Sequence, residues 1–150
     1  MPAAVPPLPV TFRPTRTRVV LIGVGVATLA TLTVVAVLLE SLTAAERISF
    51  VLTGALFLAV LALLARPHVT ADADGVTVVN LTRSRRLEWA EILAVNLRSG
   101  DPWVSLDLAD GTSLPAMGIQ PGISRAQAVR DATALRALAQ EHGTGHPGAD

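Results

Sequence analysis

Residues 19–39 read VVLIGVGVATLATLTVVAVLL and contain no charged side chain. As an α-helix, this uncharged run would reach about 31 Å, close to the thickness of the hydrocarbon core of a bilayer. Its many β-branched residues would weaken a helix in water, but a bilayer forces each backbone polar group to be satisfied within the segment. The stretch therefore predicts a transmembrane helix.

A second uncharged run, ISFVLTGALFLAVLALLA, occupies residues 48–65. As a helix it would reach about 27 Å, which is just enough to span a bilayer. Only residues 40–47 connect the two runs, so the helices are expected to run antiparallel. Residues 19–66 therefore predict a two-helix transmembrane hairpin, with spans at 19–39 and 48–65.

Small residues in the two runs bear on how the helices pack. Gly23 and Ala27 in the first run, and Ala55 and Ala59 in the second, would permit close approach of neighbouring helices. We expect them to pack within the hairpin, and dimerisation is the alternative.

A secretory signal peptide would also begin with basic residues and an apolar stretch. The first run, however, is longer than the roughly 7–15 apolar residues of a signal peptide, and a second apolar run follows at once. The hairpin is the better interpretation.

The arginines around the two runs predict how the hairpin is oriented. Arg66 follows the second run and Arg47 lies in the connection, while three arginines precede the first run: Arg13, Arg16 and Arg18. Basic residues favour the cytoplasmic side of a membrane. We therefore expect a multi-pass protein of the plasma membrane with both termini in the cytoplasm.

Composition excludes several classes of function. The twelve basic residues are all arginine and balance twelve acidic residues, so nothing favours nucleic acid as a partner. The absence of cysteine excludes disulfides, thiol nucleophiles and thiolate metal sites. His142 and His146 have a metal-ligand spacing, but the glycines and proline around them argue against a helix and hence a site. We find no catalytic constellation, and we expect no enzyme activity, no cofactor and no metal.

The two ends of the chain look different from the rest. Residues 1–18 are rich in proline and arginine and lack an apolar period, which predicts a disordered cytoplasmic tail. Residues 142–150 are rich in glycine and predict a second disordered tail.

Between these ends, residues 67–141 have the pattern of a small β-rich domain. Apolar and polar residues alternate in several short runs, and Asp74-Gly75 and Asp110-Gly111 supply hairpin turns. The last element is a helix, because Ser124 and Gln127 have the spacing of a capping box and apolar residues recur behind them at helical spacing.

Two stretches of this domain resemble a known family. Residues 66–76 read RPHVTADADGV and residues 85–92 read RRLEWAEI. Both resemble the bacterial PH domain of the low-molecular-weight protein antigen 6 family of actinobacteria, in which two apolar segments also precede the domain. The resemblance implies a PH-like antiparallel β-barrel or sandwich, closed by a C-terminal helix, and no catalytic residues. PH domains that bind inositol phosphates use a basic loop between their first two strands, whereas residues 72–75 are acidic here.

Four residues are candidates for ligand or lipid contact. Arg83, Arg85 and Arg86 lie within four residues at a predicted turn, where they would either meet anionic headgroups or form a solvated hairpin tip. Trp89 shares the apolar face of its strand and is expected in the core. Trp103 lies on the opposite face from Val104 and is the better candidate for a contact residue.

These observations lead to two hypotheses. The first is a membrane-anchored binding or adaptor protein that presents the PH-like domain to a protein partner, or to anionic lipid headgroups, at the inner face of the membrane. The alternative is a structural or regulatory subunit of a membrane protein complex assembled through the hairpin. A membrane enzyme is disfavoured, because neither span contains an ionisable residue.

Overall fold

The computed structural model describes residues 4–143. The chain divides into two compact units, which we describe separately. One unit is helical and comprises Thr15–Arg66. The other contains the sheets and combines residues 4–14 with residues 67–143.

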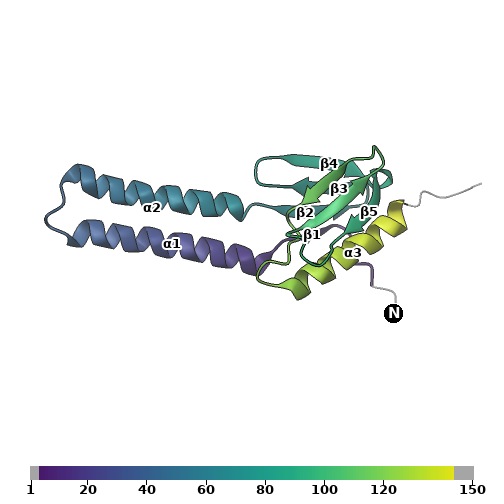
Figure 1. The fold of residues 1–150 in the computed structure, drawn as a ribbon, viewed down its shortest axis with the longest axis horizontal. Helices are drawn as coiled ribbons and strands as arrows, with labels where there is room; N and C mark the ends of the chain where they lie inside the picture. The colour runs from purple at the N-terminus through teal and green to yellow at the C-terminus, as the bar shows by residue number, and fades with distance from the viewer. Residues whose placement is uncertain (1–3, 144–150) are drawn as a thin grey trace, which may run out of the picture. The chain divides into compact units, whose positions relative to one another are not determined.

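The helical unit is a hairpin of α1 (Thr15–Leu38) and α2 (Ala44–Leu64) (Figure 1). Both helices begin four residues earlier than the predicted spans. In α2 the reason is a capping box: the Thr43 hydroxyl accepts the backbone N–H of Glu46, and the Glu46 carboxylate accepts the backbone N–H of Thr43 at 2.7 Å. This motif extends α2 across much of the expected connection.

Two glycines let the helices of the hairpin pack closely. A Cβ on Gly54 would lie 3.0 Å from Cα of Leu29, and a Cβ on Gly25 would lie 2.7 Å from Cδ1 of Leu58. The small residues predicted for this role are not in the contact, because a Cβ on Gly23 would meet nothing within 4 Å. The other three small residues are exposed: Ala27, Ala55 and Ala59. The prediction chose the wrong small residues because the positions of small residues in the sequence do not show which face of a helix packs against the other helix.

The outer surface of the hairpin is apolar. Mean hydropathy reaches 2.4 in α1 and 2.2 in α2, and both helices are long enough to cross a membrane. Only 11% and 6% of these segments are buried inside the structure, so the two helices are not the buried core of the described chain. Valine and leucine side chains such as Val19, Val37 and Leu52 are more than 60% exposed.

The other unit contains two antiparallel sheets. The first sheet has the order β1-β2-β3-β4 and the second has the order β5-β6-β7. The strands are β1 (Val10–Phe12), β2 (His68–Asp72), β3 (Gly75–Val79), β4 (Ser84–Glu88), β5 (Ile92–Asn96), β6 (Val104–Leu108) and β7 (Ser113–Ala116). A 3-10 turn over Trp89–Glu91 leads from the first sheet to the second. No strand is shared between the sheets, so the fold is a sandwich and the barrel alternative does not apply.

Strand β1 differs from the tail expected over residues 1–18. Val10 pairs with Ala71 and Phe12 pairs with Val69, and the Phe12 side chain is 5% exposed in the core. The first four residues of α1, Thr15–Arg18, also fall in this range. The helical hairpin is therefore inserted into the β-domain, between two strands that pair with each other. Of the second predicted tail, 142–150, only residues 142 and 143 are described and they end α3; the rest lies outside the described residues.

Helix α3 (Arg125–Gly143) closes the domain, as expected for a PH-like fold. Its buried face, which includes Leu135 and Leu138, joins a core built from the inward positions of both sheets. Gln127 does not complete the predicted capping box with Ser124, because its side-chain amide donates instead to the backbone carbonyl of Arg13 at 2.7 Å. That hydrogen bond ties the start of α3 to the residue that follows β1.

Candidate functional site

Two of the candidate arginines are held by acidic residues. The Arg86 guanidinium donates to both carboxylate oxygens of Asp72, at 2.7 Å for Nη2 to Oδ1, and to the Thr77 hydroxyl. This hydrogen bonding lowers the pKa of Asp72 from 3.8 to about 2. Arg85 lies 3.7 Å from Asp110, whose pKa is lowered mainly by a hydrogen bond from the Thr112 hydroxyl.

The Asp72 carboxylate also shapes the acidic turn between β2 and β3. Its Oδ1 accepts the backbone N–H groups of Asp74 and Gly75 at 3.0 and 3.2 Å. A Cβ on Gly75 would lie 2.0 Å from the Leu87 carbonyl oxygen, so only glycine fits there. The turn is a closed, self-bonded structure that also binds Arg86.

Arg83 lies apart from the other two arginines. It ends the turn 80–83 between β3 and β4, where the Asn80 backbone N–H donates to the Arg83 carbonyl at 2.8 Å. Because Val79 pairs with His68, this turn lies at the end of the first sheet where β2 begins and β1 ends. We call this the connector end, defined by Phe12, His68 and the turn 80–83, because both chain connections to the helical hairpin leave the domain there.

The opposite end of the domain, the far end, is defined by the turn 72–75, Glu88 and Asp110. Gly75 pairs with Glu88 in the first sheet. The second sheet joins at the same end, because the backbone N–H of Ala109 donates to the Glu91 carbonyl at 2.8 Å. The three arginines that are close in sequence are therefore separated in space. Arg83 lies at the connector end, while the side chains of Arg85 and Arg86 reach acids of the far end.

The two tryptophans have different environments. Trp89 is 5% exposed, its indole N–H donates to the Asp72 carbonyl at 3.0 Å, and its ring stacks on His142 with centroids 5.1 Å apart. It belongs to the core, as expected. Trp103 is half-buried just before β6, so part of its ring is available for contact.

The connector end is completed by the loop that follows β7. The Asn80 side chain donates to the Pro115 carbonyl at 2.8 Å and accepts the backbone N–H of Met117 at 3.1 Å. A Cβ on Gly118 would lie 2.5 Å from Cα of His68, so the loop lies directly against the start of β2. Both sheets and the start of α3 therefore meet at the connector end.

A pocket of about 330 Å³ opens between the β5–β6 loop and the start of α3. Its charged residues are Arg98, Asp101 and Arg125, and the Asp101 carboxylate accepts the backbone N–H of Arg98 at 2.8 Å. Sequence reasoning missed this site. Nothing local relates Arg98 to Arg125, and only the packing of α3 on the second sheet brings them together.

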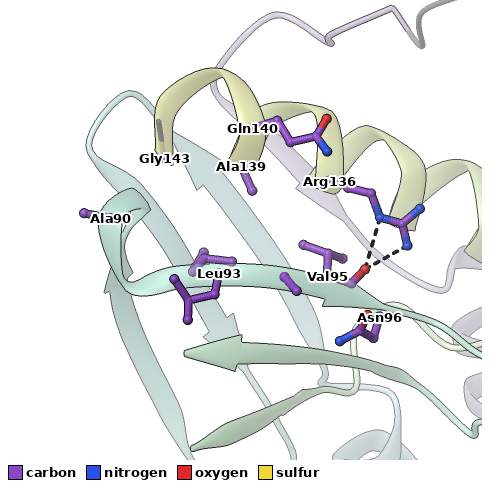
Figure 2. A pocket seen from close by; sticks show the side chains of 10 residues that line it. Ala90, Leu93, Val95, Asn96, Arg136, Ala139, Gln140 and Gly143 are labelled. Atoms are coloured by element: carbon purple, nitrogen blue, oxygen red, sulfur yellow. Dashed lines mark hydrogen bonds between the residues drawn. The ribbon is translucent and has the colours of Figure 1, made fainter. Parts of the chain in front are cut away.

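A groove of about 400 Å³ runs between the free edge of β5 and α3 (Figure 2). Arg136 reaches from α3 to the edge, and its Nε and Nη2 donate to the Val95 carbonyl at 3.1 and 2.7 Å. Figure 2 shows this guanidinium lying over the strand edge. Arg136 thereby occupies the backbone acceptor that an added strand would need.

Metal binding receives no support from the part of the chain that the structure describes. Within residues 4–143, no three histidine, cysteine, aspartate or glutamate side chains gather as a metal site would require. His142 bonds through Nδ1 to the Leu138 carbonyl at 3.0 Å, and His146 lies outside the described residues.

Comparisons with known proteins agree with the fold. Residues 66–138 match the family model described as bacterial PH domain. Over 94 residues the chain is 30% identical to uncharacterised proteins of Mycobacterium bovis and of two Mycobacterium tuberculosis strains, which covers 63% of this chain and 60% of each relative. The chain thus spans less than two thirds of the length of these relatives. No solved structure matches it. Residues 66–138, just under half of the chain, are therefore similar to the bacterial PH domain.

Proposed function

We propose that this protein is a membrane-anchored binding or adaptor module that presents its PH-like domain at the inner face of the plasma membrane. The observation that carries the proposal is the position of the helical hairpin, which interrupts the domain between β1 and β2. The chain leaves the first sheet after β1, forms the two apolar helices and returns to the same sheet as β2.

This connection favours two complete spans. Since Phe12 pairs with Val69, a topology that keeps this pair intact has the residues before α1 and after α2 on the same side of the membrane. Two antiparallel helices with apolar outer faces satisfy this requirement, whereas one spanning helix would separate the paired strands. The connection also argues against removal of the first helix as a signal peptide, because β1 would be lost with it.

The arginine distribution supports a cytoplasmic position for the domain. Arg47 is in the first turn of α2, where its guanidinium donates to the Leu39 and Leu42 carbonyls. The other flanking arginines lie on the domain side of the helices: Arg13, Arg16, Arg18 and Arg66. This asymmetry favours a cytoplasmic domain and both termini inside.

Among the contact candidates, we propose Arg83 and Trp103 as the residues best placed to meet a partner. Arg83 is exposed at the connector end and Trp103 is half-buried at the start of β6. Arg85 and Arg86 already hold Asp110 and Asp72, so a ligand would have to displace these acids. The partner class is a protein or an anionic lipid surface.

Cysteine labelling tests the topology, since the chain has no natural cysteine. In a bacterial host, Ser41→Cys lies between the helices and Ser99→Cys lies in the exposed β5–β6 loop. An impermeant maleimide should label Ser41→Cys in intact cells, and should label Ser99→Cys only after lysis. Labelling of Ser99→Cys in intact cells would overturn the proposal.

A further inference from the structure

The pocket between the β5–β6 loop and the start of α3 brings together residues that are far apart in sequence. Leu97, Arg98 and Asp101 line it from the loop, and Arg125 and Val129 line it from the helix. All of these residues belong to the β-domain, so the shape of the pocket is set within one compact unit. Its volume of about 330 Å³ is at the small end of the range for ligand pockets, roughly 300–1,000 Å³. The pocket therefore suits a small chemical group or a short part of a larger partner.

Two positive charges in this pocket have no acidic partner among the residues that the structure describes. Arg98 is half-buried and Arg125 is exposed, and neither guanidinium forms an ion pair within residues 4–143. By contrast, Arg85 and Arg86 of the same domain are each paired with an acid. The guanidinium groups of the pocket are thus available to a ligand with acceptor oxygens.

Asp101 adds an acceptor of its own to the pocket. One oxygen of its carboxylate, Oδ2, accepts the backbone N–H of Arg98 at 2.8 Å, and within residues 4–143 the other oxygen accepts no hydrogen bond. An anion that carries only acceptors, such as phosphate, would satisfy the arginines but would lie against this like charge. A ligand with both a carboxylate and an N–H donor satisfies all three side chains. An acidic residue of a polypeptide has both groups, because its carboxylate and its backbone N–H belong to one residue.

Apolar side chains flank the charged part of the pocket. Val129 lies about one helical turn after Arg125 and is 48% exposed, and Ile123, just before the helix, is 54% exposed. Protein interfaces combine a buried apolar centre with polar contacts around it. An apolar residue next to the acidic one would complete such an interface by covering Val129.

We propose that this pocket binds an acidic segment of a protein partner. Arg98 and Arg125 bind the side-chain carboxylate, since their planar N–H donors match its two oxygens. Asp101 accepts a backbone N–H of the same segment, and Val129 contacts an apolar neighbour. This inference rests on the proposed function, because it names the chemistry of the partner that the binding module meets.

Saturation-transfer NMR of the full chain in a deuterated neutral detergent tests the proposal. The probe is a pentapeptide with one glutamate next to one leucine in an otherwise glycine sequence, and the signal from empty micelles is subtracted. The protein should bind this peptide, and should bind the matching glutamine peptide about tenfold more weakly, the factor expected for one charge-assisted hydrogen bond. Arg98→Gln and Arg125→Gln should each weaken binding of the glutamate peptide by a similar factor. Equal binding of the two peptides, or no binding of either at millimolar concentration, would overturn the proposal.

Arg130→Gln is the matched control, because Arg130 is exposed on the same helix but does not line the pocket. It should leave binding of the glutamate peptide unchanged. Equal losses in Arg125→Gln and Arg130→Gln would attribute the binding to overall charge and overturn the site.

Two further probes test the roles of the acceptor and the donor in the ligand. Methylation of the backbone nitrogen of the glutamate should weaken binding severalfold, because it removes the N–H that Asp101 accepts; unchanged binding would contradict that contact. Inorganic phosphate at the concentration of the peptide should not displace it. Displacement would identify phosphate, free or in a headgroup, as the ligand and overturn the peptide assignment. Cysteine labelling tests the topology separately, so a failed pocket with correct labelling would leave the proposed function standing.

Discussion

The Asp72 carboxylate links the stability of the β-domain to pH. Hydrogen bonds from Arg86 hold its pKa at about 2 in the folded chain, against an ordinary value of 3.8. A carboxyl with a lowered folded pKa stabilises the native state above its unfolded pKa, and this stabilisation is lost as pH falls through the folded value. The contribution should therefore be complete above about pH 5 and decline between about pH 4 and pH 2.

Arg86→Gln tests this link, because it removes the ion pair and leaves the Asp72 turn intact. Thermal unfolding of the full chain in detergent can be followed by tryptophan fluorescence. Trp89 contributes to this signal, and its indole N–H donates to the Asp72 carbonyl. The midpoint of the variant should lie below that of the wild type at pH 7, and the gap should narrow as pH falls from 4 to 2. Arg83→Gln, at an exposed turn, should change neither the unfolding midpoint at pH 7 nor its dependence on pH. A gap that persists unchanged at pH 2 would contradict the ionic origin.

At the scale of the helices, two glycines explain how closely α1 and α2 approach. Gly54→Ala would put its Cβ 3.0 Å from the backbone Cα of Leu29, which cannot move without the helix. We expect it to destabilise the hairpin by roughly 1–3 kcal/mol, as overpacking does elsewhere. Gly23→Ala has open space around it and should be neutral or stabilise by up to about 1 kcal/mol through helix propensity. Helical circular dichroism during titration with sodium dodecyl sulfate measures the stability of the hairpin in both variants. Equal losses of stability in the two variants would show that Gly54 is not a packing contact.

The elements were predictable where local pattern is strong. Continuous apolar runs predicted α1 and α2, and alternation with Asp-Gly turns predicted most strands of the sandwich. The Thr43–Glu46 capping box was readable in the sequence, but it was included in the connection, so the start of α2 was placed too late. Strand β1 was missed because its three residues lie between prolines, and its partner β2 is more than fifty residues away in sequence.

At the scale of the whole molecule, the candidate site depends on contacts that no local pattern encodes. The sequence placed three arginines within four residues, and the structure sends two of them to acids of the far end. Arg98 and Arg125, which sequence reasoning passed over, meet because α3 packs on the second sheet. The direction of the Arg85 and Arg86 side chains explains the first result, and the packing of residues far apart in sequence explains the second.

The insertion of the hairpin predicts that residues 67–143 alone are an incomplete domain. Without β1 the edge of β2 is exposed and the core lacks Phe12, which is 5% exposed in the full chain. Joining residues 4–14 to residues 67–143 through a short Gly/Ser loop should restore the strand pairing at β2 and the Phe12 side chain in the core. A short loop suffices because β1 and β2 are antiparallel neighbours, so the end of β1 lies beside the start of β2. Removing a buried phenylalanine typically costs about 3–5 kcal/mol. The joined domain should therefore unfold at a clearly higher urea concentration than residues 67–143.

Phe12→Ala in the joined domain separates the side chain from the strand. If filling of the core by Phe12 dominates, this variant should lose most of the increase in urea midpoint that joining β1 produced. If pairing of β1 with β2 protects the sheet edge, the variant should keep much of that increase. Urea unfolding followed by tryptophan fluorescence compares all three proteins, since Trp89 and Trp103 both lie within residues 67–143. Equal midpoints for the joined domain and residues 67–143 would mean that β1 contributes nothing to the domain, and that the hairpin is attached to the sandwich only through β2.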